Sequence, residues 1–167
     1  MQPQRSGLIH TLGIMETIRN LEAELGKIAS YDDFCHTCSL FAGSSHQVVF
    51  QALWPPAIGR SDATEMAGYM LAELQPDSDH GIESLMAQIH SSALDASNRI
   101  VPFYLVSQFG RRTVLRAASD FIRSLPQGSP RSRVDAVQYW AAFPASELCK
   151  QFHDWEARDT YGISDDA

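Results

Sequence analysis

The chain has 167 residues, the length of about one domain, and a net charge of −7. Its composition, 44% apolar and 20% charged, is typical of a folded globular protein and excludes a disordered chain. No apolar run approaches the roughly 18 residues of a membrane span, and an acidic residue, Glu16, soon follows the short apolar patch near the N-terminus, which argues against a secretory signal. Three cysteines form a poor disulfide framework and fit a reducing compartment. We therefore expect one cytoplasmic domain over residues 1–167, with no membrane partner.

Residues 7–29 have the spacing of an amphipathic helix. Apolar side chains recur at alternating intervals of four and three residues, as in a coiled coil, and these are Ile14, Ile18, Leu21, Leu25 and Ile28. The pattern covers about two heptads, fewer than the three to four that indicate a coiled coil. The first interpretation is a helix that packs on its own domain. The alternative is that these five residues form the contact of a homodimer.

Residues 31–43, YDDFCHTCSLFAG, hold two cysteines in C-x-x-C spacing. One of the two aspartates is placed to cap a helix over this segment. Cys35 and Cys38 are then three residues apart and share the face that carries Phe34 and Phe41. This placement favours thiols buried in the core, because free cysteine is among the most buried residue types.

A redox dithiol is an alternative for the same pair. A reactive thiolate needs a helix N-terminus or a cation close by, whereas Asp32 and Asp33 place negative charge beside Cys35. A C-x-x-C pair on a helix resembles the alkylhydroperoxidase-like thiol peroxidases, which carry C-x-x-C-x-x-x-H. Here Ala42 stands at the histidine position, so the proton relay that the resemblance implies is missing.

Structural zinc is a second alternative for these cysteines. Cys149 and His153 are four residues apart on the last predicted helix, a spacing at which two side chains can bind one ion. Together with Cys35 and Cys38 they would form a Cys3His set, a known zinc composition. If the helices that carry these four residues do not lie side by side, we expect no metal and no other cofactor.

Two segments are ambiguous between strand and helix. Residues 47–54 are rich in valine and phenylalanine and end at two prolines, which predict a stop. Residues 99–106 contain Pro102, which a helix starting at Asn98 would tolerate in its first turn. We favour helices and expect an all-α bundle of about seven helices; the alternative is an α+β fold with a small sheet from these two segments.

The remaining chain shows clear helical patterns. Aspartates are placed to cap two helices, Asp62 before the first and Asp79 before the second. Three further helices are predicted over residues 111–125, 132–143 and 146–158, and a frayed tail over residues 160–167.

Arginine is concentrated in one part of the sequence. Residues 99–133 contain seven arginines and a single acidic residue, Asp120, although the chain as a whole is acidic. On the helix over residues 111–125, the face opposite the apolar one carries Arg112, Arg116 and Arg123, and Arg111 precedes them. We rank a solvated or internally paired face first, an acidic protein partner second and nucleic acid third, because a protein of charge −7 repels nucleic acid at long range.

The sequence contains no complete catalytic set and no nucleotide-binding or zincin motif. We therefore predict a regulatory or adaptor protein that binds another protein without catalysis. Its partner surface would be the arginine face, and the chain would form a homodimer. Two alternatives remain: a thiol-dependent oxidoreductase using Cys35 and Cys38, and a nucleic-acid-binding regulator using residues 99–133.

Overall fold

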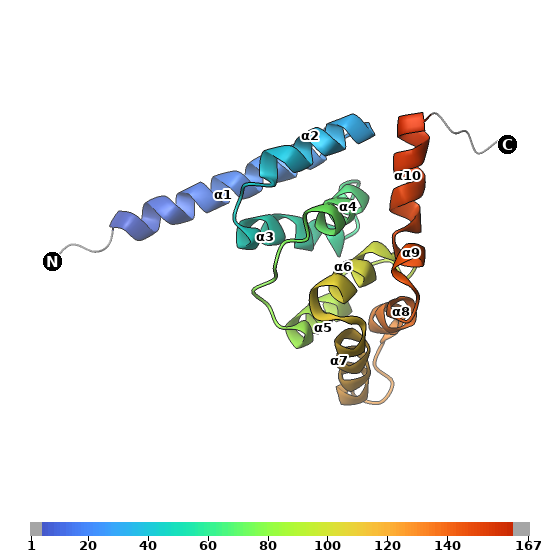
Figure 1. Ribbon diagram of the computed structural model, residues 1–167. Coiled ribbons are helices and arrows are strands. Elements are labelled where there is room, and N and C mark those ends of the chain that lie inside the picture. Colours follow the sequence, from blue (N-terminus) through green and yellow to red (C-terminus); the bar gives the residue numbers. More distant parts are fainter. Residues whose placement is uncertain (1–4, 162–167) are drawn as a thin grey trace.

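The computed structural model describes the backbone of residues 5–161 and the side chains of residues 15–157. Over the described backbone the chain is helical without strands, which confirms the all-α prediction (Figure 1). Residues 5–161 contain ten helices rather than about seven, because both ambiguous segments are helical and residues 145–161 form two helices. Their bounds are α1 Arg5–Leu25, α2 Tyr31–Phe41, α3 His46–Ala57, α4 Thr64–Leu74, α5 Ile82–Ser91, α6 Ile100–Phe109, α7 Arg111–Ser124, α8 Ser132–Ala141, α9 Ala145–Leu148 and α10 Lys150–Tyr161.

The two segments considered as strands are the buried helices α3 and α6, so the α+β alternative is wrong. In α6 the amide of Val101 donates to the Asn98 Oδ1 atom at 3.0 Å, and this side chain closes the helix start. Pro102 is the third residue of α6, where a missing N–H breaks no bond within the helix. The apolar run in this segment therefore reflects burial and not sheet pairing.

The prolines at the end of α3 do not stop the helix where the sequence predicted. Pro55 and Pro56 lie inside the last turn, and α3 continues to Ala57. The amide of Ile58 donates to the Trp54 carbonyl at 3.1 Å and closes the end. A proline loses its own N–H bond, but the bonds that follow it can still form.

The predicted aspartate caps of α4 and α5 are also wrong. The N-cap positions are Ala63 and Gly81, and neither gives a side-chain bond. The turn before α4 is instead held by the Ser61 amide, which donates to the Thr64 hydroxyl at 2.9 Å. For α2 the cap is Ser30, and Asp33 completes a capping box as its third residue.

The last part of α1 packs against α3 and α2, and this contact bears on the predicted dimer (Figure 1). Leu21 and Leu25 are only 1% and 3% exposed, and both belong to the chain's own core. Ile18 and Ile28 pack against the same core, whereas the side chain of Ile14 lies outside the described residues. Four of the five residues proposed for a dimer contact therefore already serve as core positions within one chain.

Helix α10 returns to the N-terminal half and packs on α2. Ring contacts join α10 to α2 and α4. Phe34 lies 5.5 Å from Phe152, and Tyr69 stacks on Trp155 at 5.4 Å. Because α10 runs to Tyr161, the first two residues of the predicted tail, 160 and 161, are helical. Residues 162–167 lie outside the described part of the chain.

In the described part of the chain, no helix is both long and apolar enough to cross a membrane.

Candidate functional site

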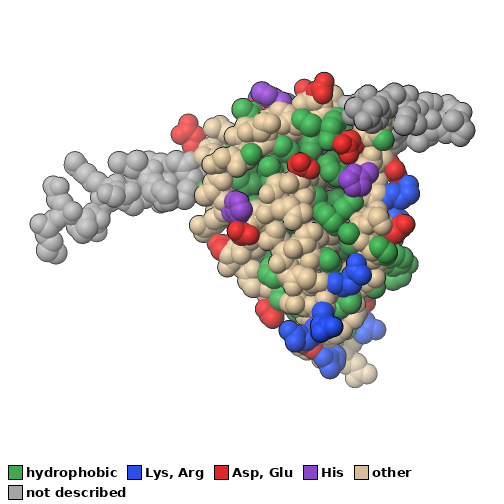
Figure 2. Space-filling model, in the orientation of Figure 1, with side chains coloured by type: hydrophobic (Ala, Val, Ile, Leu, Met, Phe, Trp, Pro, Cys, Tyr) green, Lys and Arg blue, Asp and Glu red, His purple; other side chains and the backbone are tan. Residues whose placement is uncertain are grey.

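Helix α7 presents an arginine face to solvent. Its apolar side, with Val114, Ala117 and Ala118, is buried against neighbouring helices. Arg112 and Arg116 are exposed and lie four residues apart, so they are neighbours on the opposite side. Figure 2 shows that most basic side chains on this view gather at the end of the molecule where α7 lies, and most acidic ones lie elsewhere. On this face of the molecule, the charge separation found in the sequence is also a separation in space.

The arginines of this face differ in what they contact. Arg123 pairs with Asp120 on the same helix, and Arg111 donates to the Phe143 carbonyl at 2.7 Å. Arg112 and Arg116 form no ion pair or hydrogen bond with any other residue that the structure describes. Of these four arginines, Arg112 and Arg116 are therefore free to bind a ligand. We call the set of four the arginine face.

Next to the start of α7 lies an aromatic cluster at the end of α8. The ring centroids of Tyr139 and Trp140 are 4.9 Å apart, and Phe143 lies 5.1 Å from Tyr139 and 5.5 Å from Trp140. Tyr139 is 58% exposed, the largest value among the exposed large apolar side chains described. The guanidinium of Arg99 lies 4.4 Å above the Trp140 ring, a cation–π geometry.

The arginine face and the aromatic cluster adjoin because α7 and α8 pack together. The Gln138 amide group donates to the Ser119 hydroxyl at 2.6 Å, which ties the middle of α7 to α8. Arg111 joins the start of α7 to Phe143, just beyond α8. Gly110, with φ of +79°, allows the sharp turn from α6 into α7 that aims this end at the aromatic cluster.

The C-x-x-C pair lines a cavity of about 280 Å³ between α2 and α4. Cys35 is exposed and Cys38 is buried, and both are free thiols. Burial, and next the negative charge of Glu73, raises the pKa of Cys38 to about 12. Among the described residues that line this cavity, Glu73 is the only charged one, and none of them is a cation that could stabilise a thiolate.

The Tyr31 side chain also lines the cavity at Cys35 and Cys38. The Tyr31 hydroxyl donates to the Glu156 carboxylate at 2.9 Å. Burial raises the pKa of Tyr31, and its hydrogen bonds to Glu156 and then to Cys35 raise it further. Of the C-x-x-C pair, only Cys38 is buried as the sequence predicted, whereas Cys35 is exposed beside Tyr31.

The four residues considered for zinc are not assembled into a site. Among the side chains described, no group of three or more histidine, cysteine, aspartate and glutamate residues is placed to hold a metal ion. Cys149 is buried at the break between α9 and α10, and burial raises the pKa of its thiol to about 11. His153 is exposed and lies 3.3 Å from Glu156.

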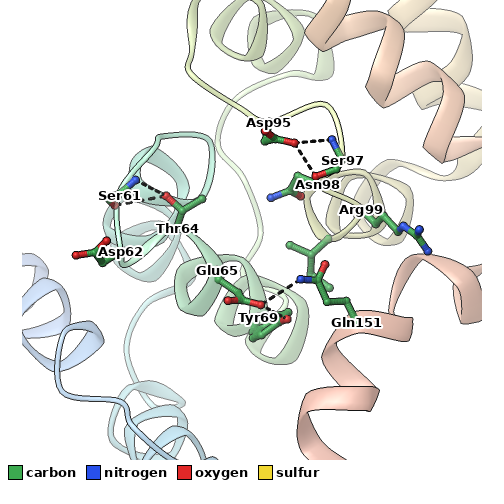
Figure 3. A pocket seen from close by; sticks show the side chains of 11 residues that line it. Ser61, Asp62, Thr64, Glu65, Tyr69, Asp95, Ser97, Asn98, Arg99 and Gln151 are labelled. Carbon is green, nitrogen blue, oxygen red and sulfur yellow. Dashed lines mark hydrogen bonds between the residues drawn. The ribbon is translucent and has the colours of Figure 1, made fainter. Parts of the chain in front are cut away.

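A polar cavity of about 370 Å³ lies where the starts of α4 and α6 meet α10 (Figure 3). Two of its three carboxylates are bound within the protein. Glu65 accepts from the Tyr69 hydroxyl at 2.6 Å and from Gln151 at 3.2 Å. Asp95 accepts from the Ser97 amide and hydroxyl, and these bonds hold its pKa below the usual range. Glu65 and Asp95 therefore already have partners within the protein, whereas Asp62, the third carboxylate that lines the cavity, is exposed and forms no hydrogen bond or ion pair with the described residues.

Sequence reasoning found the arginine face but missed the aromatic cluster. Trp140 is half-buried, and its ring packs against the exposed Tyr139. The short run YWAAF at residues 139–143 carries a signal, because it places three aromatic residues where a helix ends.

No protein-family model, no curated protein and no solved structure matches this chain.

Proposed function

We propose that this chain is a small helical regulatory or adaptor protein that binds an acidic segment of a partner protein through its arginine face, without catalysis. The observation that carries the proposal is the pair Arg112 and Arg116. Both are exposed, they are one turn apart, and neither has an ionic partner among the described residues. Two such guanidinium groups can bind carboxylates in fork geometry.

A protein partner suits the charge distribution better than nucleic acid does. The chain carries −7 overall, with 12 acidic against four basic residues in positions 1–95. Long-range repulsion from that acidic part would oppose binding to an extended polyanion. A short acidic segment can contact the arginine face without approaching the acidic part.

The test is fluorescence anisotropy at low salt with a labelled glutamate-rich peptide. The double variant R112E/R116E should abolish binding, and added salt should weaken binding to the wild-type protein because exposed charges are screened. The matched control is K27E/K150E, which changes the net charge equally at two exposed lysines that have local ion pairs elsewhere. Equal loss in both variants, or no binding by the wild type, would contradict the proposal.

Duplex DNA of equal charge serves as the competing probe. Tighter binding to the duplex than to the peptide, lost in R112E/R116E, would favour the nucleic-acid alternative. A thiol-dependent peroxide reduction that Cys35→Ser abolishes would favour the enzyme alternative. Cytoplasmic location and homodimerisation stay predictions, and a dimer would have to use residues other than the buried Leu21 and Leu25.

A further inference from the structure

We infer that the acidic segment is anchored by an apolar side chain on the aromatic cluster, so that the preferred ligand alternates acidic with aromatic or aliphatic residues. This inference rests on the proposed function and specifies the ligand of the same surface. It concerns Tyr139, Trp140 and Phe143, which adjoin the start of the arginine face.

The cluster has the properties of a binding anchor. Tyr139 exposes 58% of its surface while its ring packs on two others. Tyrosine, tryptophan and arginine are the residues most enriched among those that dominate binding energy at interfaces. An exposed tyrosine on a packed aromatic base offers a large contact area at low entropic cost.

The cluster is also held rigidly before any ligand arrives. The Trp140 indole N–H donates to the Ala96 carbonyl at 2.8 Å, and Arg99 covers the other side of the ring at 4.4 Å. Arg111 fixes the backbone at Phe143 at 2.7 Å. A surface already in its bound arrangement loses less entropy on association.

Charge selects the occupant of this surface. Arg99 and Arg111 lie at the aromatic cluster, and Arg112 and Arg116 continue the positive charge along α7. A purely apolar segment would leave these guanidinium groups unpaired, and a purely acidic one would leave Tyr139 in water. A segment that alternates the two residue types satisfies both, because it complements the charge and covers the rings.

The experiment compares two labelled peptides of equal length and equal glutamate count. In one the glutamates are separated by serine, and in the other by leucine and phenylalanine. The wild-type protein should bind the second peptide about tenfold more tightly, the effect of one good apolar anchor. Tyr139→Ser should remove this difference, and R112E/R116E should weaken binding of both peptides.

The matched control is Leu40→Ser on α2, because Leu40 is 54% exposed and lies on a different helix. It should leave the difference between the peptides intact. Circular dichroism establishes that each variant stays folded. If both peptides bind the wild type equally, or if Leu40→Ser also removes the difference, the inference fails while the proposed function stands.

Two other outcomes would contradict the proposed function together with this inference. If neither peptide binds, the proposed function fails with the inference. If a single-stranded oligonucleotide binds more tightly than both peptides and Tyr139→Ser weakens it, the rings stack bases, and the surface belongs to a nucleic-acid binder.

Discussion

Gly68 of α4 faces Ile100 of α6 at a distance that only glycine permits. A Cβ atom placed on residue 68 would lie 2.5 Å from the Ile100 Cγ2 atom, inside van der Waals contact. This close crossing sets the start of α6, and Arg99, which stacks on Trp140, is the residue just before that helix. The position of the aromatic cluster therefore depends on a missing methyl group on α4.

We expect Gly68→Ala to lower the free energy of unfolding by about 1–3 kcal/mol, the usual cost of overpacking a core contact. Denaturant unfolding measures the loss. Ile100→Ala removes the atom that would clash, so the double variant should be less destabilised than the sum of the two single variants. Additive losses would mean that residues 68 and 100 do not oppose one another.

The three thiols should differ sharply in reactivity. Cys35 is exposed, whereas Cys38 and Cys149 are buried with pKa values raised to about 12 and about 11. In the folded protein, we therefore expect a disulfide reagent near pH 8 to modify Cys35 rapidly and the other two only after denaturation. Rapid modification of two thiols, with Cys35→Ser leaving one, would contradict the burial of Cys38.

The same shifts predict how stability depends on alkaline pH. A thiol whose pKa is raised by folding favours the folded state while it is neutral, so its contribution is complete below about pH 9. That contribution is lost as pH rises towards 12, at most about 1.4 kcal/mol per pH unit for each thiol. Cys38→Ala should flatten the fall in unfolding free energy over this range. An unchanged slope would show that other groups cause it.

The sequence predicts a helix well where apolar residues recur at helical spacing, as in α7. It predicts a helix poorly where the helix is buried on most sides, because nearly every residue is then apolar. Residues 47–54 and 99–106 lie in helices buried on most sides, and a continuous apolar run does not distinguish such a helix from a strand. Arg112 and Arg116 could be placed from spacing alone because they lie on one helix. The aromatic cluster could not, since it depends on how α8 packs on α7 and on Arg99, which precedes α6.

Ser30 and Asp33 form a capping box whose contribution to the stability of the fold should depend on pH. The Asp33 amide donates to the Ser30 hydroxyl at 3.1 Å, and the Asp33 carboxylate accepts from the Ser30 amide at 3.1 Å. The hydrogen bond with the Ser30 side chain, and next the one from the Ala29 amide, holds the pKa of Asp33 below its ordinary value of 3.8. Its contribution is therefore present above about pH 4 and is lost as pH falls below the folded pKa.

We expect Ser30→Ala to cost about 1 kcal/mol at neutral pH and to reduce the loss of stability on acidification. Ser45→Ala is the comparison, because Ser45 caps α3 at 3.4 Å but Val48 stands where a capping box needs a carboxylate. That variant should leave the acid dependence unchanged. Unfolding curves at pH 7 and pH 3 measure both, and equal acid dependence in all three proteins would contradict the role of Asp33.

Helix α10 should detach from the rest when its central ring is removed. Phe152 is buried against Phe34 at 5.5 Å and Tyr69 at 4.9 Å. Phe152→Ala removes these contacts at a cost of about 3–5 kcal/mol if α10 stays docked. Because α10 is the last helix of the described chain, we expect it to open locally before the full cost is reached.

Hydrogen exchange distinguishes the two responses. Local release predicts that protection is lost in α10 and weakened in α2, while α7 and α8 keep theirs, because α10 packs mainly on α2 and α9. Lys150→Ala, which removes only the exposed ion pair with Asp154, is the control and should leave protection unchanged. Equal loss of protection in α7 and α10 would show that the helices unfold as one unit, so that α10 belongs to the same cooperative core as the binding surface.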